Sequence, residues 1–296
     1  MKNTIFTGTG TAIITPFNAD GSINYDELGR IIDDQIANSI DAIIICGTTG
    51  ESATMTDEEH IECIRYAVKH INGRIPVIAG AGSNDTRYAV ELSKKAEEAG
   101  ADALLLITPY YNKTTQNGLI AHFTAVADAV NTPIILYNVP SRTGMCIDVS
   151  TIKTLSKHKN IVAVKEASGN FAYLSKIMAE CGDDIDVYSG NDDMVVPLMS
   201  LGGKGVISVA SHIIPKQMHD MTQYCLDNNF AEAMKIQIEY LDICNDLFME
   251  VSPIPIKEAM NMLGWNAGPC RLPLVEMTDE HKAKLRATLA KHGLLK

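Results

Sequence analysis

The sequence has neither a long apolar run nor an excess of positive charge, and these two absences exclude broad classes of protein. No stretch of about 18 consecutive apolar residues occurs, so we expect no membrane-spanning segment. The 25 lysine and arginine residues face 36 aspartate and glutamate residues, which gives a formal net charge of −11. Binding to nucleic acid needs a concentrated basic surface, and no basic run is present, so we expect no nucleic-acid partner.

The cysteine content also argues against a secreted, disulfide-built protein. Seven cysteines, an odd number, are scattered over 296 residues. Threonine, glycine and proline interrupt the first 17 residues, which therefore lack the continuous apolar core of a signal peptide. Reduced thiols in a cytoplasm fit this pattern better, so we expect a cytoplasmic protein.

Several well-known catalytic motifs are missing as well. No G-x-G-x-x-G follows an apolar run, and no H-E-x-x-H, EF-hand loop or nucleophile-elbow serine occurs. His60 and Cys63 share a predicted helix face, but no further ligand spacing supports zinc, and we interpret both as structural. The glycines around Lys204 resemble a phosphate loop, but they precede an apolar run, and we interpret them as a turn. We therefore expect no metal site.

Eight short apolar runs do recur along the first two thirds of the chain. Each is rich in isoleucine, valine or leucine and ends in turn-forming residues, as buried parallel strands do. The runs are 11–15, 42–46, 76–79, 103–107, 133–137, 161–165, 186–188 and 205–208. Helical patterns separate them, and two begin with a capping box, at 24–27 and 56–59. This alternation predicts a (β/α)₈ TIM barrel rather than a doubly wound open sheet, which usually has fewer strands and a glycine-rich dinucleotide turn.

The pattern changes after about residue 225. Segments 229–250, 253–263 and 278–292 read as helices with no strand between them. We therefore predict a catalytic barrel over residues 1–225 and a small helical C-terminal domain over residues 226–296.

Barrel enzymes carry their chemistry at the C-terminal ends of the strands, so the residues that follow each run are candidates. After the second run, Thr48 and Thr49 lie between glycines, where hydroxyls and free N–H groups can hold a carboxylate. The alternative is a threonine-rich turn that caps its own backbone. After the fourth run, Tyr110 and Tyr111 offer a phenol for proton transfer, or they merely pack.

The fifth run ends in Tyr137, and Arg142 follows it in a loop that contains proline and glycine. A guanidinium there can hold a carboxylate with two hydrogen bonds, although a surface ion pair is the alternative.

The sixth run places Lys165 at the apolar mouth of the predicted barrel. Removal from water disfavours its charged form and lowers its pKa, which makes a neutral amine available to form a Schiff base. The alternative is an exposed lysine paired with Glu166. The coincidence of lysine, tyrosine, arginine and paired threonines on one predicted face favours the catalytic interpretation.

Five segments at these strand ends together resemble one family. The segments are GTTGES (47–52), TPYYNK (108–113), YNVPSRTG (137–144), VKEASG (164–169) and YSGNDD (188–193). They are similar to the dihydrodipicolinate synthases, within the wider group of pyruvate-dependent class I lyases that includes N-acetylneuraminate lyase. The resemblance runs essentially end to end and includes the helical C-terminal part.

The resemblance implies a carbon–oxygen hydro-lyase that condenses pyruvate with L-aspartate 4-semialdehyde, in the first committed step of the diaminopimelate route to L-lysine. Lys165 would form the imine with pyruvate. Tyr137 would move protons, connected through Thr48 to Tyr111, which in the family reaches in from a neighbouring subunit. No metal, nucleotide or flavin cofactor would be required.

The resemblance also implies where the substrates bind. Thr49 would hold the pyruvate carboxylate, Ile207 and Gly190 would line the same pocket, and Arg142 would bind the carboxylate of the semialdehyde. The expected assembly is a homotetramer, a dimer of tight dimers. A sugar-acid aldolase of the same chemistry is the alternative function, but a sugar polyol has no need for the second carboxylate anchor that Arg142 provides. A barrel that binds without catalysis has no chemical reason to hold all four catalytic residues.

Many relatives are inhibited by L-lysine at a cleft in the dimer interface. The residues that match this cleft are Ser52, Ala53, His60, Asn84 and Tyr110. Asp57, however, stands where sensitive enzymes can have histidine, and Tyr88 stands where they can have the glutamate that recognises the ammonium of lysine. Loss of that carboxylate predicts weak or absent inhibition by lysine.

Overall fold

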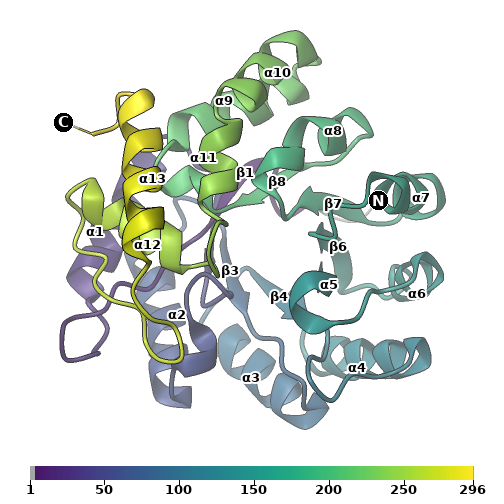
Figure 1. The fold of residues 1–296 in the computed structure, drawn as a ribbon. Coiled ribbons are helices and arrows are strands. Elements are labelled where there is room, and N and C mark those ends of the chain that lie inside the picture. Colours follow the sequence, from purple (N-terminus) through teal and green to yellow (C-terminus); the bar gives the residue numbers. More distant parts are fainter. Residues whose placement is uncertain (1–3, 296) are drawn as a thin grey trace.

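The computed structural model describes residues 4–295, and its centre is a closed barrel of eight parallel strands (Figure 1). The strands are β1 (Gly8–Ala12), β2 (Ala42–Ile45), β3 (Val77–Gly80), β4 (Ala103–Ile107), β5 (Ile134–Asn138), β6 (Ile161–Glu166), β7 (Asp186–Ser189) and β8 (Gly205–Ser208). Each strand pairs with the next along the chain, and β1 pairs with β8 to close the barrel. The predicted (β/α)₈ barrel is confirmed.

Helices surround the barrel (Figure 1). They are α1 (Tyr25–Ala37), α2 (Asp57–Ile71), α3 (Thr86–Glu98), α4 (Gln116–Ala129), α5 (Pro140–Thr143), α6 (Val149–Leu155), α7 (Phe171–Cys181), α8 (Val195–Ser200) and α9 (Pro215–Leu226), with single 3₁₀ turns η1 (Ser52–Thr54), η2 (Asp192–Met194) and η3 (Ala210–His212). Within residues 4–295, none of the helices has the length and apolar content needed to cross a membrane.

The two predicted capping boxes differ in outcome. At the start of α2, Thr56 and Glu59 exchange both hydrogen bonds, as predicted. At the start of α1, Asn24 accepts from the N–H of Glu27, but the Glu27 carboxylate does not return the bond. It accepts instead from Arg30 and from the backbone N–H of Asn266, so tertiary contacts override the local cap.

Four helices follow the barrel: α10 (Phe230–Glu239), α11 (Leu241–Asp246), α12 (Ile254–Met262) and α13 (Asp279–Lys291). The prediction of one helix over 229–250 is wrong. The chain leaves helical geometry at Tyr240, whose ring stacks on His292 with the ring centroids 5.0 Å apart, and α11 is a separate short helix. The predicted domain boundary at residues 225 and 226 falls at the end of α9 and stays a prediction.

The first strand also differs from the prediction, since it covers Gly8–Ala12 rather than 11–15. Thr9 and Thr11 are buried polar residues that interrupt the apolar pattern, yet distant partners satisfy both. The Thr9 hydroxyl donates to the carbonyl of Met218, and the Thr11 hydroxyl donates to the side chain of Gln35. Beyond the strand, the N–H of Ile14 donates to the imidazole of His212 rather than to a neighbouring strand.

Strand register places Lys165 at the level of two tyrosines inside the barrel. Lys165 on β6 is paired with Tyr137 on β5 and with Tyr188 on β7. Alternation along β6 points Ala163 into the barrel and Val164 toward the helices. Lys165, two residues after Ala163, therefore shares the inward direction.

Candidate active site

Lys165 is buried at the C-terminal mouth of the barrel, with a relative exposure of 6%. Its Nζ lies 4.5 Å from the centroid of the Tyr137 ring. Burial lowers the pKa of Lys165 to about 8; the carboxylate of Asp192 opposes this shift and the guanidinium of Arg142 adds to it. About a tenth of this amine is therefore unprotonated at pH 7, far more than for an ordinary lysine, and the neutral form is what attack on a carbonyl carbon requires.

The alternative of an exposed Lys165 paired with Glu166 is wrong. The Glu166 carboxylate points away from the barrel interior and accepts from the side-chain amide of Asn138 at 2.7 Å and from the N–H of Ser168 at 2.6 Å. Among the residues that the structure describes, no carboxylate lies within 4.0 Å of the Lys165 ammonium. The lysine is thus left free to react.

Tyr137 ends β5 beside the lysine and is also buried. Burial raises the pKa of Tyr137 to about 12, with a small opposing effect of Arg142. The phenol is protonated at neutral pH, as an ordinary tyrosine is, and burial makes it hold its proton more tightly.

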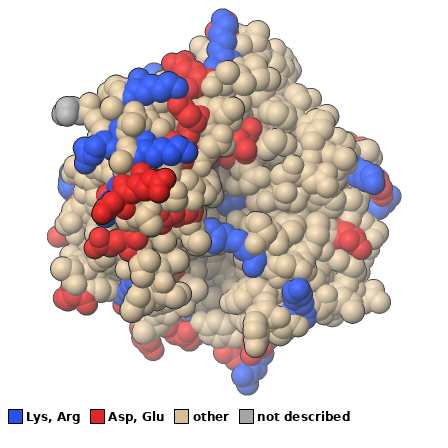
Figure 2. Space-filling view, in the orientation of Figure 1, with Lys and Arg blue, Asp and Glu red and all other residues tan. Residues whose placement is uncertain are grey.

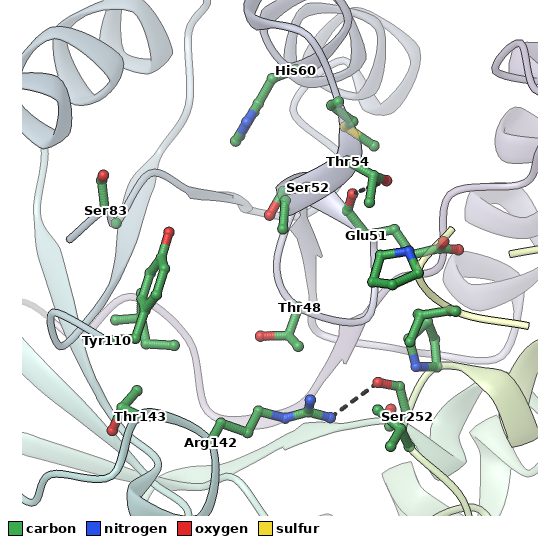
Figure 3. A pocket seen from close by; sticks show the side chains of 18 of the residues that line it. Thr48, Glu51, Ser52, Thr54, His60, Ser83, Tyr110, Arg142, Thr143 and Ser252 are labelled. Carbon is green, nitrogen blue, oxygen red and sulfur yellow. Dashed lines mark hydrogen bonds between the residues drawn. The ribbon is translucent and has the colours of Figure 1, made fainter. Parts of the chain in front are cut away.

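Thr48 and Thr49 follow β2 in a tight turn. Backbone groups close this turn: the N–H of Gly50 donates to the carbonyl of Gly47, and the N–H of Glu51 donates to the carbonyl of Thr48, both at 3.1 Å. Neither threonine hydroxyl has a hydrogen-bond partner within the described part of the chain. The hydroxyls therefore do not cap their own turn, and Thr48 lines a cavity of about 460 Å³ (Figure 3).

Arg142 in α5 borders the same cavity from the opposite side, below Thr48 in Figure 3. Its Nη2 donates to the carbonyl oxygen of Ser252 at 3.1 Å. No carboxylate pairs with it in the described residues, so the alternative of a surface ion pair is wrong. A second cavity, of about 500 Å³, joins Arg142 to Tyr137 and Gly190. Figure 2 shows a hollow in this face of the molecule with basic side chains beside it.

Gly190 and Ile207 complete the surroundings of the lysine. Ile207 lies on β8 and belongs to the apolar cluster inside the barrel. A Cβ atom at Gly190 would lie 2.6 Å from the Cβ of Ala167 and 3.1 Å from the Cε of Lys165. Only glycine fits at this position without moving the lysine or β6.

Tyr111 is the one predicted catalytic residue that the structure does not bring to the others. Its side chain is 94% exposed, and its backbone has a φ of +67°, a value that non-glycine residues rarely adopt. The loop around it is held by neighbours, because Asn84 donates to the carbonyl of Tyr110 and Asn112 donates to the carbonyl of Asn84. Tyr111 therefore points outward from an ordered loop.

Residues of the predicted lysine cleft lie next to the cavity of about 460 Å³ that Thr48 lines. Ser52, Ala53, His60 and Tyr110 line it together with Tyr88, and Asn84 contacts Tyr110. The Tyr88 hydroxyl donates to Asp57 at 2.6 Å, and the ammonium of Lys95 lies 3.7 Å from the same carboxylate. Asp57 thus has partners of its own.

Asp192 also belongs to the surroundings of Lys165, although no sequence pattern identified it as a site residue. Its carboxylate is buried and accepts from the N–H groups of Val209 and Ala210 at 3.0 and 2.9 Å. Burial raises the pKa of Asp192. Its position in YSGNDD directly after a strand was the only signal in the sequence.

No cluster of three or more histidine, cysteine, aspartate or glutamate side chains suited to a metal ion occurs in residues 4–295. His60 is held instead by its Nε2, which lies 2.8 Å from the carbonyl oxygen of Gly80.

Comparison with known proteins assigns the family. The model of the dihydrodipicolinate synthetase family matches residues 5–292. The chain belongs to this family. It is 56% identical to the 4-hydroxy-tetrahydrodipicolinate synthase of Acetivibrio thermocellus over 100% of both chains, and 54% identical to that of Lachnoclostridium phytofermentans over 98% of this chain and 99% of the relative. The crystal structure of dihydrodipicolinate synthase from Aquifex aeolicus has a TM-score of 0.96 at 46% identity, covering 98% of this chain and 100% of that one. The protein is therefore an enzyme of the pyruvate-dependent class I lyase group.

The burial of Lys165 predicts a stability effect that depends on pH. Its pKa falls from 10.5 to about 8 on folding, so below pH 8 the folded state carries a buried charge at a cost, and above pH 10.5 neither state carries it. Lys165→Met removes this charge penalty. The removal should raise the free energy of unfolding by about 3 kcal/mol at pH 7 but by less than about 1 kcal/mol at pH 10. Urea unfolding of both proteins at the two pH values measures the difference, and an equal gain at both would contradict the burial of a charged amine.

Proposed function

We propose that this enzyme condenses pyruvate with L-aspartate 4-semialdehyde to give 4-hydroxy-tetrahydrodipicolinate, in the diaminopimelate route to L-lysine. The observation that carries the proposal is the buried Lys165 amine beside the Tyr137 ring. Full-length relatives at 50–56% identity that bear the synthase name support it.

The chemistry follows from a buried amine whose pKa is lowered to about 8. The Nζ of Lys165 attacks the keto carbon of pyruvate, and loss of water gives an imine. Loss of a methyl proton then gives an enamine, whose carbon attacks the aldehyde of the semialdehyde to form the new carbon–carbon bond. The amine of the semialdehyde attacks the imine carbon, closes the ring and releases Lys165.

Tyr137 moves protons in these steps. Its phenol is protonated at neutral pH, and its ring lies 4.5 Å from the Lys165 Nζ that gains and loses protons. The free hydroxyl of Thr48 extends the path away from Tyr137 toward Tyr111 of a neighbouring subunit.

Substrate carboxylates bind at two positions. Thr49 holds the carboxylate of pyruvate, in a pocket that Ile207 and Gly190 line, and Arg142 holds that of the semialdehyde. Arg142 suits this role because it faces a cavity and has no carboxylate partner among the described residues. A protein with a net charge of −11 needs such a local cation to bind two anions.

Assembly completes the site. We infer a homotetramer built as a dimer of tight dimers, in which Tyr111 enters the active site of the adjacent subunit. Its 94% exposure and its positive φ support this role, because a solvent-facing tyrosine on a strained backbone is explained by a partner. We also infer a cytoplasmic location and a division into a barrel of residues 1–225 and a helical domain of residues 226–296.

A condensation assay tests the function. Purified protein is mixed with pyruvate and aspartate semialdehyde, and a coupled reductase consumes the cyclic product. Lys165→Ala should abolish turnover because no other group supplies the imine nitrogen, whereas Lys176→Ala, which removes an exposed lysine of α7, should leave it unchanged. Absence of turnover by the unmodified protein with an active semialdehyde, or turnover that survives Lys165→Ala, would contradict the proposal.

Lysine should inhibit this enzyme weakly or not at all. The glutamate that recognises its ammonium is replaced by Tyr88, and Asp57 is already bonded to Tyr88 and close to Lys95. Loss of a carboxylate partner weakens binding of a cation by about 10- to 100-fold. Titration of lysine into the condensation assay measures this, and Tyr88→Glu should increase the inhibition. Clear inhibition of the unmodified enzyme at submillimolar lysine would show the prediction wrong.

A further inference from the structure

A buried ion pair connects the C-terminal helices to the turn that carries Thr48 and Thr49. Lys257 of α12 donates from Nζ to the Glu51 carboxylate at 2.7 Å, and the two side chains are only 2% and 1% exposed. Glu51 is the last residue of the turn after β2. The partners lie 206 residues apart in the sequence, so the contact exists only in the folded chain.

Both oxygens of the Glu51 carboxylate are used. One accepts from Lys257, and the other accepts from the backbone N–H of Arg271 at 2.8 Å. The Lys257 ammonium also donates to the carbonyl of Pro269 at 2.7 Å and lies 4.2 Å from the centroid of the Phe17 ring. The carboxylate and the ammonium are therefore held at fixed positions by several directional contacts.

The backbone conformation of Glu51 explains why the turn needs these contacts. Its φ is +55°, and its N–H donates to the carbonyl of Thr48 at 3.1 Å. A left-handed conformation in a glutamate costs free energy and persists only where surrounding contacts impose it. Figure 3 shows the side chains of Thr48 and Glu51 leaving this turn in different directions. The carboxylate thus fixes the turn through Lys257 and Arg271, and both Thr48 and Glu51 border the cavity of about 460 Å³.

Arg271 adds a second connection to the same region. Its guanidinium donates to the carboxylate of Glu59 on α2 and to the carbonyl of Thr54, which ends the short η1 turn after Glu51. It also lies over the Phe17 ring, at 4.3 Å from the centroid. The segment that follows the turn is therefore tied to the C-terminal part as well.

A contribution to stability does not by itself explain why Glu51 and Lys257 form a buried ion pair beside this turn. Apolar residues of similar volume are often as stable as a buried ion pair or more stable, because both ions lose their hydration. Directional bonds, unlike apolar contacts, specify where a particular backbone atom lies. A buried ion pair beside a catalytic turn is therefore better explained by the need to fix the position of that turn.

We propose that Glu51 and Lys257, with the backbone N–H of Arg271, are positioning residues that hold the Thr48–Thr49 turn in register with Lys165. This proposal rests on the function proposed above for the two threonines. Both oxygens of the Glu51 carboxylate are occupied by Lys257 and by the backbone N–H of Arg271, so in this proposal the anchoring groups act through the turn.

Three variants test the proposal: Glu51→Gln, Lys257→Met and the double variant. Each single variant leaves one buried charge without its partner and should lower the melting temperature, while the double variant removes both charges and should recover it. The pyruvate concentration that half-saturates borohydride trapping on Lys165 should rise about tenfold in all three, because the hydroxyl of Thr49 no longer meets the carboxylate in place. Persistence of this rise in the double variant, at restored stability, is the expected result.

Asp246→Asn provides the matched control. Asp246 is a buried acid of the same C-terminal helices that pairs with Lys284 and Thr288 and makes no contact with the turn. The control variant should lower the melting temperature without changing pyruvate trapping. Recovery of both stability and pyruvate trapping in the double variant, or unchanged trapping in every variant, would overturn the proposal. The unmodified enzyme, run in the same trapping and condensation assays, tests the proposed function separately: absence of activity there overturns that function, and with it the positioning role.

Discussion

The removal of one ammonium group from water is the constraint on which the rest of this structure depends. Lys165 occupies an inward position of β6, where a charged side chain loses most of its hydration and its pKa falls to about 8. Strand register fixes Tyr137 at the same level, and Gly190 leaves the space that the lysine stem requires. The barrel thus makes the Lys165 amine reactive by burying it. Among the described residues, no carboxylate oxygen lies within 4.0 Å of its Nζ.

The groups that accompany the lysine come from loops, and loops need anchors. The Thr48–Thr49 turn is closed by its own backbone and held by the Glu51–Lys257 pair. Arg142 is steadied by the carbonyl of Ser252. Both anchors belong to the C-terminal part of the chain, so the helices after the barrel contact the site on two sides and do more than cover its surface.

Much of this could be predicted from the sequence because the signals are local. Short apolar runs predicted eight strands, and turn-forming residues marked the ends where Thr48, Tyr137 and Lys165 lie. The first strand was misplaced because Thr9, a buried polar residue between two glycines, finds its hydrogen-bond partner far away in the chain, at the carbonyl of Met218, which no local pattern reveals. The Glu51–Lys257 pair, the burial of Asp192 and the break at Tyr240 escaped prediction for the same reason. The place of Tyr111 depends on a second subunit, so neither the sequence nor a single chain contains its partner.

The pH dependence of imine formation tests the central claim most directly. Enzyme and pyruvate are incubated for short times at a series of pH values, then quenched into borohydride at one fixed pH, and the adduct on Lys165 is counted by peptide mass spectrometry. A desolvated lysine with a pKa of about 8 predicts a rate constant that rises with a midpoint near pH 8 and then levels off. A rate that still rises toward the ordinary lysine value of 10.5, or an adduct on a different residue, would contradict the account.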